Sequence, residues 1–150
     1  MKRVFTAVVA VAAIASALPA AAQFAKPEDA IKYRKAAFTV MAAHFGRVAA
    51  MANGRIPFDA KAAASNAEIA NMVAALPFAG FGDGTDKGDT RAKANVWSER
   101  DKFNAAATKM QEEMVKLNAA AKTGDQAAMR TAAGAVGQAC KGCHDTYRRE

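Results

Sequence analysis

Apolar positions recur at alternating spacings of three and four residues from Ile31 onward, which is the spacing of one face of an α-helix. Pro27 and the two acidic residues after it suit a first helical turn, and Asn53-Gly54 suits a helix end. The pattern therefore predicts a helix over 27–52. Its inward face carries Ile31, Phe38, Met41, Phe45, Val48 and Ala52.

A second helical pattern follows, with Asp59 as the expected N-cap and Pro77 as a barrier that the helix cannot pass. This segment is shorter and rich in alanine. We expect its large apolar residues to face the core, namely Ile69, Met72, Val73 and Leu76.

Between Pro77 and Asn95 the periodicity vanishes, and the density of glycine and aspartate predicts a long ordered loop. Loops of this length in a compact domain are uncommon unless they serve a function. Ser98 with Asp101 then indicates a capping box, and Gly124 suits the end of a third helix. Its predicted core residues are Phe103, Ala107, Met110, Met114, Leu117 and Ala121.

Asp125 is the expected N-cap of a fourth helix that continues to the end of the sequence. Its apolar stripe includes both cysteines of the chain, and consists of Met129, Ala133, Val136, Cys140, Cys143 and Tyr147.

These four amphipathic segments predict an all-α, antiparallel four-helix bundle, since no segment shows strand alternation of useful length. Many inward positions are alanine. Such small core faces either allow very close helix packing or leave room for a large group between the helices.

Residues 1–22 have the pattern of a secretory signal peptide. Lys2 and Arg3 precede an uncharged apolar run, and Ala20-Ala21-Ala22 supplies small residues for cleavage. A membrane anchor is the less favoured alternative, because the run is shorter than the ~20 residues of a membrane-spanning helix. We expect one mature domain over 23–150, exported to the periplasm and without a membrane span.

Charge adds little to this picture. Removing residues 1–22 takes away two of the 21 cations, which leaves 19 against 14 acidic residues and a net charge of +5. The cations are scattered and have no aromatic residues among them. The sequence thus gives little support for nucleic-acid binding.

The strongest chemical signal is CKGCH, which spans Cys140 to His144. A Cys-x-x-Cys-His run is the attachment motif of c-type haem. On a helix the two cysteines project to the same side, so both thiols can add to the vinyl groups of one porphyrin. His144 follows at the next position and is suited to bind the iron as the proximal ligand.

Other uses of this cluster fit less well. A structural zinc site needs four ligands, and outside the motif only His44 is a good nitrogen donor. His44 lies off the main apolar stripe, which favours a surface or edge position. A thioredoxin-like pair would need a βαβ setting, and a simple disulfide leaves His144 unexplained. We therefore expect one covalently attached haem c in each chain.

Placement of the motif near the end of the sequence means that any residue over the other face of the iron comes from upstream. The helix over 27–52 is the simplest source, because it runs antiparallel to the fourth helix in an up-down bundle. Phe38 and Met41 lie one turn apart on its inward face, and only one of them can sit over the iron.

Across nearly the whole mature chain the sequence resembles the cytochromes c′. The segments that carry the resemblance are QFAKPEDAIKYRKAAFTVMAAHFGR, LPFAGFGDGTDKGDTR, Trp97 and CKGCHDTYRRE. The resemblance implies a left-handed four-helix bundle around a high-spin haem, and a frequent homodimer through the first two helices. It also implies one protein ligand to the iron and an apolar side chain over the distal face.

The same resemblance assigns roles to individual positions. Cys140 and Cys143 match the thioether anchors and His144 the axial ligand, while Phe38 matches the distal residue. The remaining matches line the haem: Arg34 at a propionate, Lys35 beside it, Arg91 with Ala92 near the propionate edge, Trp97 packed close to the ring, and Arg148 next to the proximal histidine.

Two of these positions can also be interpreted without the resemblance. Arg34 lies on the inward face, where an unpaired guanidinium is costly to bury, so it either meets an anion such as a propionate or extends to solvent. Arg148 lies near the end of its helix, where a cation interacts favourably with the helix dipole.

Two functions remain open at this point. With Phe38 over the iron, the protein binds NO or CO at a five-coordinate haem and can transfer electrons. With Met41 as the second ligand, it is a six-coordinate, low-spin electron carrier that exchanges electrons with redox partner proteins. We do not expect an enzyme, because no acid-base pair stands near the distal position.

Overall fold

The computed structural model describes residues 23–150, so the predicted signal peptide lies outside the described part. Four long helices and two short helical segments follow one another along the chain. They are α1 (Pro27–Ala52), α2 (Ala60–Val73), the 3₁₀ segment η2 (Leu76–Gly80), α3 (Asn95–Ser98), α4 (Arg100–Lys122) and α5 (Gln126–Tyr147).

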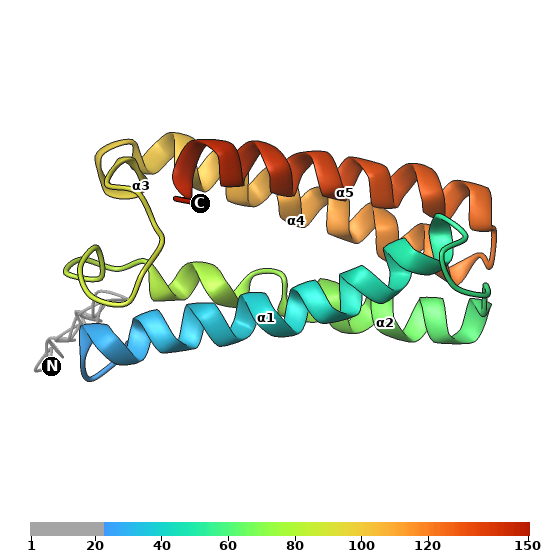
Figure 1. The fold of residues 1–150 in the computed structure, drawn as a ribbon, viewed down its shortest axis with the longest axis horizontal. Helices are drawn as coiled ribbons and strands as arrows, with labels where there is room; N and C mark the ends of the chain where they lie inside the picture. The colour runs from blue at the N-terminus through green and yellow to red at the C-terminus, as the bar shows by residue number, and fades with distance from the viewer. Residues whose placement is uncertain (1–22) are drawn as a thin grey trace, which may run out of the picture.

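The four long helices form the expected antiparallel bundle, in which each helix runs opposite to the one before it (Figure 1). α1 contacts α2 and α5, and α4 contacts the same two helices, so the bundle closes into a ring of four. No helix between residues 23 and 150 is long and apolar enough to cross a membrane. The predicted fold class is confirmed.

Most of the predicted helix ends are confirmed. The carboxylate of Asp59 accepts a hydrogen bond from the backbone of Ala62, and Asp125 accepts two from the first turn of α5. α1 ends at Ala52 with Asn53 as its C-cap, and Gly54 takes the left-handed conformation with φ of 69°.

The predicted capping box at Ser98 is wrong. Ser98 is the last residue of α3, and its backbone N–H donates to the carbonyl of Ala94. It is therefore already inside a helical turn and cannot take the extended backbone of an N-cap. α4 begins two residues later, at Arg100, after Glu99.

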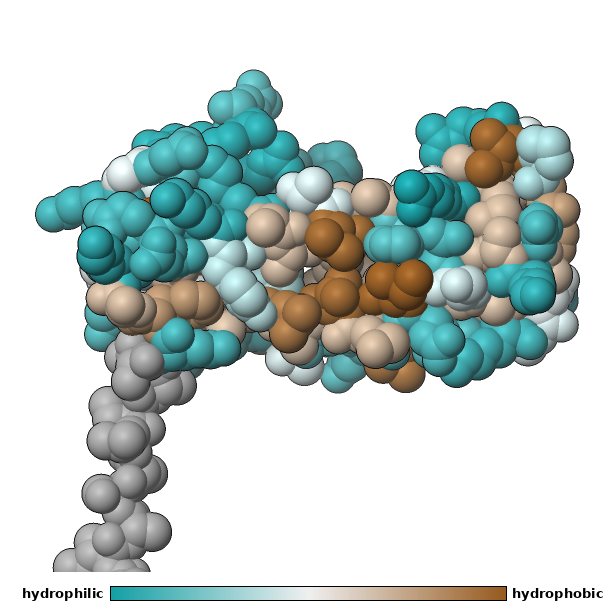
Figure 2. All heavy atoms as spheres, turned by 90° about the horizontal axis from the view of Figure 1, so that it is seen from below, coloured by the Kyte–Doolittle hydropathy of each residue, from teal (hydrophilic) through white to brown (hydrophobic). Residues whose placement is uncertain are grey.

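The predicted inward faces of α4 and α5 are confirmed, apart from the two cysteines of α5, which are only half-buried. The inward face of α2 is different. Its buried residues are alanines, whereas Met72 is 72% exposed and Leu76 is 43% exposed. An alanine stripe lets α2 approach its neighbours closely, so Met72 and Leu76 turn outward. Of the other two predicted core residues, Ile69 is half-buried and Val73 packs half-buried against the main core. Figure 2 shows apolar side chains gathered on the face formed by α1 and α2.

Side chains of α5 fix the end of α1. Gln126 donates to the carbonyl of Met51 at 3.0 Å, and Arg130 donates to the carbonyl of Ala52 at 3.0 Å. These carbonyls lie in the last turn of α1, where no helical partner is available. The end of the bundle away from the cysteines is therefore closed by hydrogen bonds as well as by packing.

At the end of the bundle that carries the cysteines, η2 approaches α1 closely. A Cβ at Gly80 would lie 2.6 Å from the carbonyl oxygen of Ala30 and 2.8 Å from Cβ of Arg34. Only glycine fits between these atoms. The contact brings the carbonyl group of Gly80 directly to the side chain of Arg34.

Candidate haem-binding site

The CKGCH motif, with its chemical groups Cys140, Cys143 and His144, lies on the last two turns of α5. Cys140 packs at the edge of the main bundle core, and Cys143 packs against a separate group of aromatic residues. Burial raises the pKa of both thiols, and the neighbouring Cys140 raises that of Cys143 further. Both sulfur atoms are thus protonated near neutral pH, on the side of α5 that faces the bundle.

Six aromatic side chains surround this end of the bundle and are called the aromatic cluster below. Phe81 contacts Phe103 with ring centroids 4.9 Å apart, and Phe103 contacts Tyr147 of α5 at 5.3 Å. The other members are Phe38, Phe78 and Trp97. The cluster therefore joins α1, η2, α4 and α5 around Cys143.

Arg34 is buried beside this cluster, with an exposed fraction of 2%. Its Nη1 donates to the carbonyl of Gly80 at 2.8 Å, and its Nη2 donates to the hydroxyl of Thr90 at 2.7 Å. Thr85 accepts two further hydrogen bonds, through its hydroxyl and its carbonyl. The guanidinium carbon lies 4.3 Å from the ring centroid of Phe81.

All four of these acceptors are neutral, and burial lowers the pKa of Arg34 to about 10. The alternative in which Arg34 extends to solvent is wrong, because its side chain is enclosed. A buried cation with only neutral partners is stabilised by a nearby anion. The haem propionates would supply one, so Arg34 fits the group that the motif implies.

Lys35, the next residue, is in a different setting. Its ammonium group pairs with Asp89, and the two side chains are 52% and 93% exposed. The pair links α1 to the loop at the surface. Lys35 thus lies beside Arg34 along the chain but outside the enclosed network.

Backbone contacts join the long loop to the end of α5. Ala92 and Arg148 form an isolated antiparallel bridge, and the N–H of Lys93 donates to the carbonyl of Tyr147 at 2.9 Å. Arg91 donates through Nε to the carbonyl of Arg149 at 3.0 Å. The loop positions named by the resemblance, Arg91 and Ala92, are therefore brought to the helix that carries the motif.

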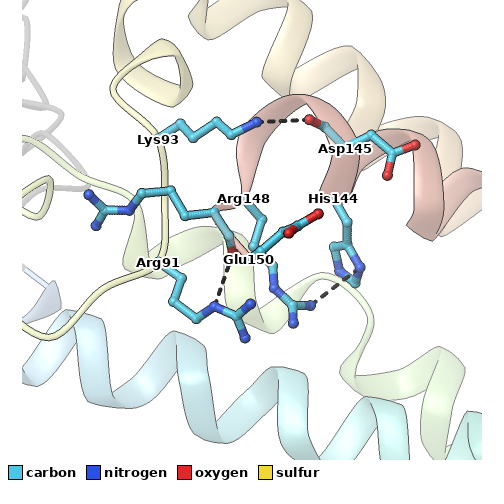
Figure 3. A pocket seen from close by; sticks show the side chains of 7 residues that line it. Arg91, Lys93, His144, Asp145, Arg148 and Glu150 are labelled. Atoms are coloured by element: carbon cyan, nitrogen blue, oxygen red, sulfur yellow. Dashed lines mark hydrogen bonds between the residues drawn. The ribbon is translucent and has the colours of Figure 1, made fainter.

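His144 and Arg148 lie one turn apart on α5, with Nη1 of Arg148 3.3 Å from Nδ1 of His144 (Figure 3). Burial lowers the pKa of His144, and the positive charges of Arg148 and Arg91 lower it as well, against a smaller opposing effect of Asp145. The imidazole is neutral near pH 7, which is the form that binds a metal. A pocket of about 430 Å³ opens beside it, lined by Arg91, Lys93, His144, Asp145, Arg148, Arg149 and Glu150.

The two distal candidates occupy different surroundings. Phe38 is half-buried and contacts Phe78 and Phe81 of the aromatic cluster. Met41 is 6% exposed and belongs to the main core, together with Met110 and Met114. Trp97 is anchored by its indole N–H, which donates to the carbonyl of Gly82 at 3.1 Å.

Sequence reasoning missed several neighbours of the site. No sequence pattern marks Gly80 of η2, or Thr85 and Thr90 of the loop, as partners of Arg34. Phe78 and Phe81 could have been found from the aromatic pair inside a glycine-rich loop, which is unusual for a solvent-exposed segment. His44 is not part of the site and contacts Asn66 of α2 through Nδ1 at 2.8 Å.

The family model of cytochrome C′ matches residues 29–148. Cytochrome c′ of Rubrivivax gelatinosus is 54% identical over 129 residues, which cover 85% of this chain and all of that protein. Its crystal structure gives a TM-score of 0.82, covering 85% of this chain and all of that one.

Structures of cytochrome c prime from Alcaligenes xylosoxidans also match. The nitric oxide complex of a leucine-to-alanine mutant is 45% identical, covers 85% of this chain and 99% of its own, and gives a TM-score of 0.80. A carbon monoxide complex of a leucine-to-glycine variant gives the same TM-score at 45% identity, covering 85% of this chain and all of that one.

The contrast between Arg34 and Lys35 gives a testable prediction. Replacing Arg34 by alanine should lower the free energy of unfolding by roughly 2–4 kcal/mol, because several buried acceptors lose their donor. Replacing Lys35 by alanine should change it by no more than about 0.5 kcal/mol, since its ion pair is exposed. Urea unfolding of both variants measures this, and equal losses would contradict the buried network.

Proposed function

The chain belongs to the cytochrome c′ family, and from this premise we propose that it is a periplasmic haem protein that binds NO or CO at a five-coordinate iron. His144 is the proximal ligand and Phe38 covers the distal face. The observation that carries the proposal is the placement of Phe38 and Met41. Phe38 is half-buried and packs against both the main core and the aromatic residues next to Cys143, whereas Met41 is enclosed in the main core.

The cofactor is haem c, attached through Cys140 and Cys143. When bound, the haem supplies an iron that takes up a diatomic ligand and exchanges one electron. Three side chains of α5 would hold the group. Neutral His144 would offer a ring nitrogen to the metal, and the sulfur atoms of Cys143, directly before it, and of Cys140, one turn earlier, would bond to the porphyrin.

The residues around the site set what can approach the iron. Phe38, Phe78 and Phe81 carry no lone pair for the iron and no proton donor. This lining favours small uncharged ligands, and the relatives that have been solved with nitric oxide and carbon monoxide support the choice of ligand. It also favours a binding and electron-transfer protein over an enzyme, because no acid-base group stands among these rings.

Arg34 has a supporting role in this proposal. Its guanidinium binds a haem propionate while its remaining N–H groups hold the loop. Neutralising that carboxylate holds the haem in place. It also favours the reduced iron, because an uncompensated negative charge nearby would stabilise the oxidised iron. Lys35, Arg91, Ala92, Trp97 and Arg148 line the same group in this proposal.

We also propose that the protein is a homodimer through α1 and α2. Because His44 contacts Asn66, Val40 of α1 lies near the last turns of the antiparallel α2. Val40 is 44% exposed and Met72 is 72% exposed. An apolar face shared by two helices is typical of a contact between subunits.

Covalent attachment is tested by extraction. In protein exported and matured in the periplasm, acid-acetone should leave the chromophore on the polypeptide. Replacing both Cys140 and Cys143 by alanine should let the solvent remove it, because only non-covalent contacts remain. Loss of all haem from the unaltered protein would refute the attachment.

The distal assignment is tested by two neighbouring substitutions. Phe38→Ala should raise the CO affinity and association rate by about tenfold, since the ligand no longer displaces a phenyl ring. Met41→Ala should lower the free energy of unfolding by about 2–5 kcal/mol and leave the haem high-spin. Flash photolysis and absorption spectra measure both effects. A low-spin spectrum that becomes high-spin only in Met41→Ala would instead make the protein an electron carrier with His144 and Met41 as ligands.

The dimer is tested by placing charge on the shared face. Val40→Glu combined with Met72→Glu should convert the dimer to a monomer in analytical ultracentrifugation, because two carboxylates cannot be buried without partners. Val115→Glu is the matched control, since Val115 is 57% exposed on α4, away from that face. A monomeric unaltered protein would refute the proposed dimer.

A further inference from the structure

Four cations line the pocket beside His144, and they are positioned without being neutralised. Arg91 donates to the carbonyl of Arg149, Lys93 donates to the carbonyl of Asp145 at 2.9 Å, and Arg149 donates to the carbonyl of Thr90 at 2.6 Å. Arg148 contacts His144. Within residues 23–150, none of these four cations forms an ion pair.

Several lysines elsewhere on the described surface do form ion pairs. On α4, Lys109 and Lys116 both pair with Glu113, and Lys122 pairs with Glu68 of α2. In the pocket, Asp145 pairs with Lys141, which lies one turn earlier on α5. Glu150 is the other carboxylate there. The pocket rim thus keeps an excess of positive charge that its own carboxylates do not cancel.

The four cations are also held on a fixed frame. The bridge between Ala92 and Arg148 joins the loop to α5, and the N–H of Arg149 donates to the carbonyl of Arg91 at 2.8 Å. Two separate segments of the chain therefore contribute cations to the lining of one pocket (Figure 3). Cations arranged in advance lose little side-chain entropy when they meet an anionic surface.

The haem itself does not account for all of this charge. The group carries two propionates, and the proposed function already assigns Arg34 and Arg91 to that edge. Lys93 and Arg149 then remain without an assigned anion. Both line the same pocket as His144, so an anionic surface docked on them lies next to the proposed iron ligand.

We propose that Lys93, Arg148 and Arg149, next to Arg91 at the propionate edge, form the docking surface for the acidic face of an electron-transfer protein. This inference rests on the proposed haem at His144. Clustered charge of one sign accelerates association with a partner of opposite sign, and the effect falls with ionic strength. Because these cations lie beside His144, the partner protein would dock at the haem end of the bundle.

Electron-transfer rates of the haem-loaded protein test the surface. The ferrous haem loses one electron, and hexacyanoferrate(III) gains it and becomes hexacyanoferrate(II). Lys93→Glu with Arg149→Glu should lower this second-order rate constant about tenfold at low salt and flatten its dependence on ionic strength. With the cationic oxidant tris(phenanthroline)cobalt(III), the same pair should raise the rate constant.

Arg55→Glu with Lys61→Glu is the matched control. It makes the same change in net charge at two exposed positions near the opposite end of the bundle, where α1 ends and α2 begins. These substitutions should change both rate constants less than twofold. Equal effects of the two pairs would show that net charge alone acts, and would overturn the proposal. Lys93→Gln with Arg149→Gln provides a milder version should the reversed charges disturb the loop.

Binding of a poly-glutamate peptide to the ¹⁵N-labelled haem protein gives a second, independent readout. Amide shifts should concentrate in residues 90–93 and 144–150 and disappear in the Lys93→Glu, Arg149→Glu variant. Shifts spread over the whole surface, or binding to anionic phospholipid vesicles but not to the peptide, would overturn the assignment to a protein partner. A chain without a haem absorption band would instead refute the proposed function.

Discussion

The burial of one guanidinium group organises the site end of this bundle. Arg34 comes from the N-terminal third of α1, where the helix face requires an inward side chain, and its charge must then be met by nearby acceptors. η2 and the loop supply them, through Gly80, Thr85 and Thr90. Hydrogen bonds to a charged group contribute about 1.5–3 kcal/mol each, enough to hold a loop that has little regular structure of its own.

Small residues make this arrangement possible. Gly80 leaves the space through which η2 reaches α1, and the alanines of α2 let that helix lie close against the bundle. The close packing has a second effect, because it turns Met72 and Leu76 outward. One compositional feature therefore shapes both the interior near the haem and the apolar outer face proposed as the dimer contact.

The loop held by Arg34 returns to α5 and completes the site from the other side. Its residues 91–93 lie against the last turn of the helix that carries the cysteines. Loop cations thereby join Arg148 and Arg149 around His144. The same backbone contacts that close the fold thus bring loop cations to the proposed iron ligand and leave a positive rim around it. Burial lowers the pKa of His144 most, and the charges of Arg148 and Arg91 lower it further.

Local physics determined much of this protein from its sequence. Helix periodicity, Asp59 and Asp125 as caps, and Gly54 after α1 follow from neighbouring residues, and CKGCH carries its chemistry in a spacing of five residues. The tertiary structure decided the rest. Which face of α2 is buried depends on how closely its neighbours approach, so Met72 was assigned to the wrong side. The cap at Ser98 failed because a short turn, α3, forms just before α4. The partners of Arg34 lie 46 to 56 residues away along the chain, and no local pattern encodes contacts over that separation. They arise only when packing of the whole bundle brings loop and helix together.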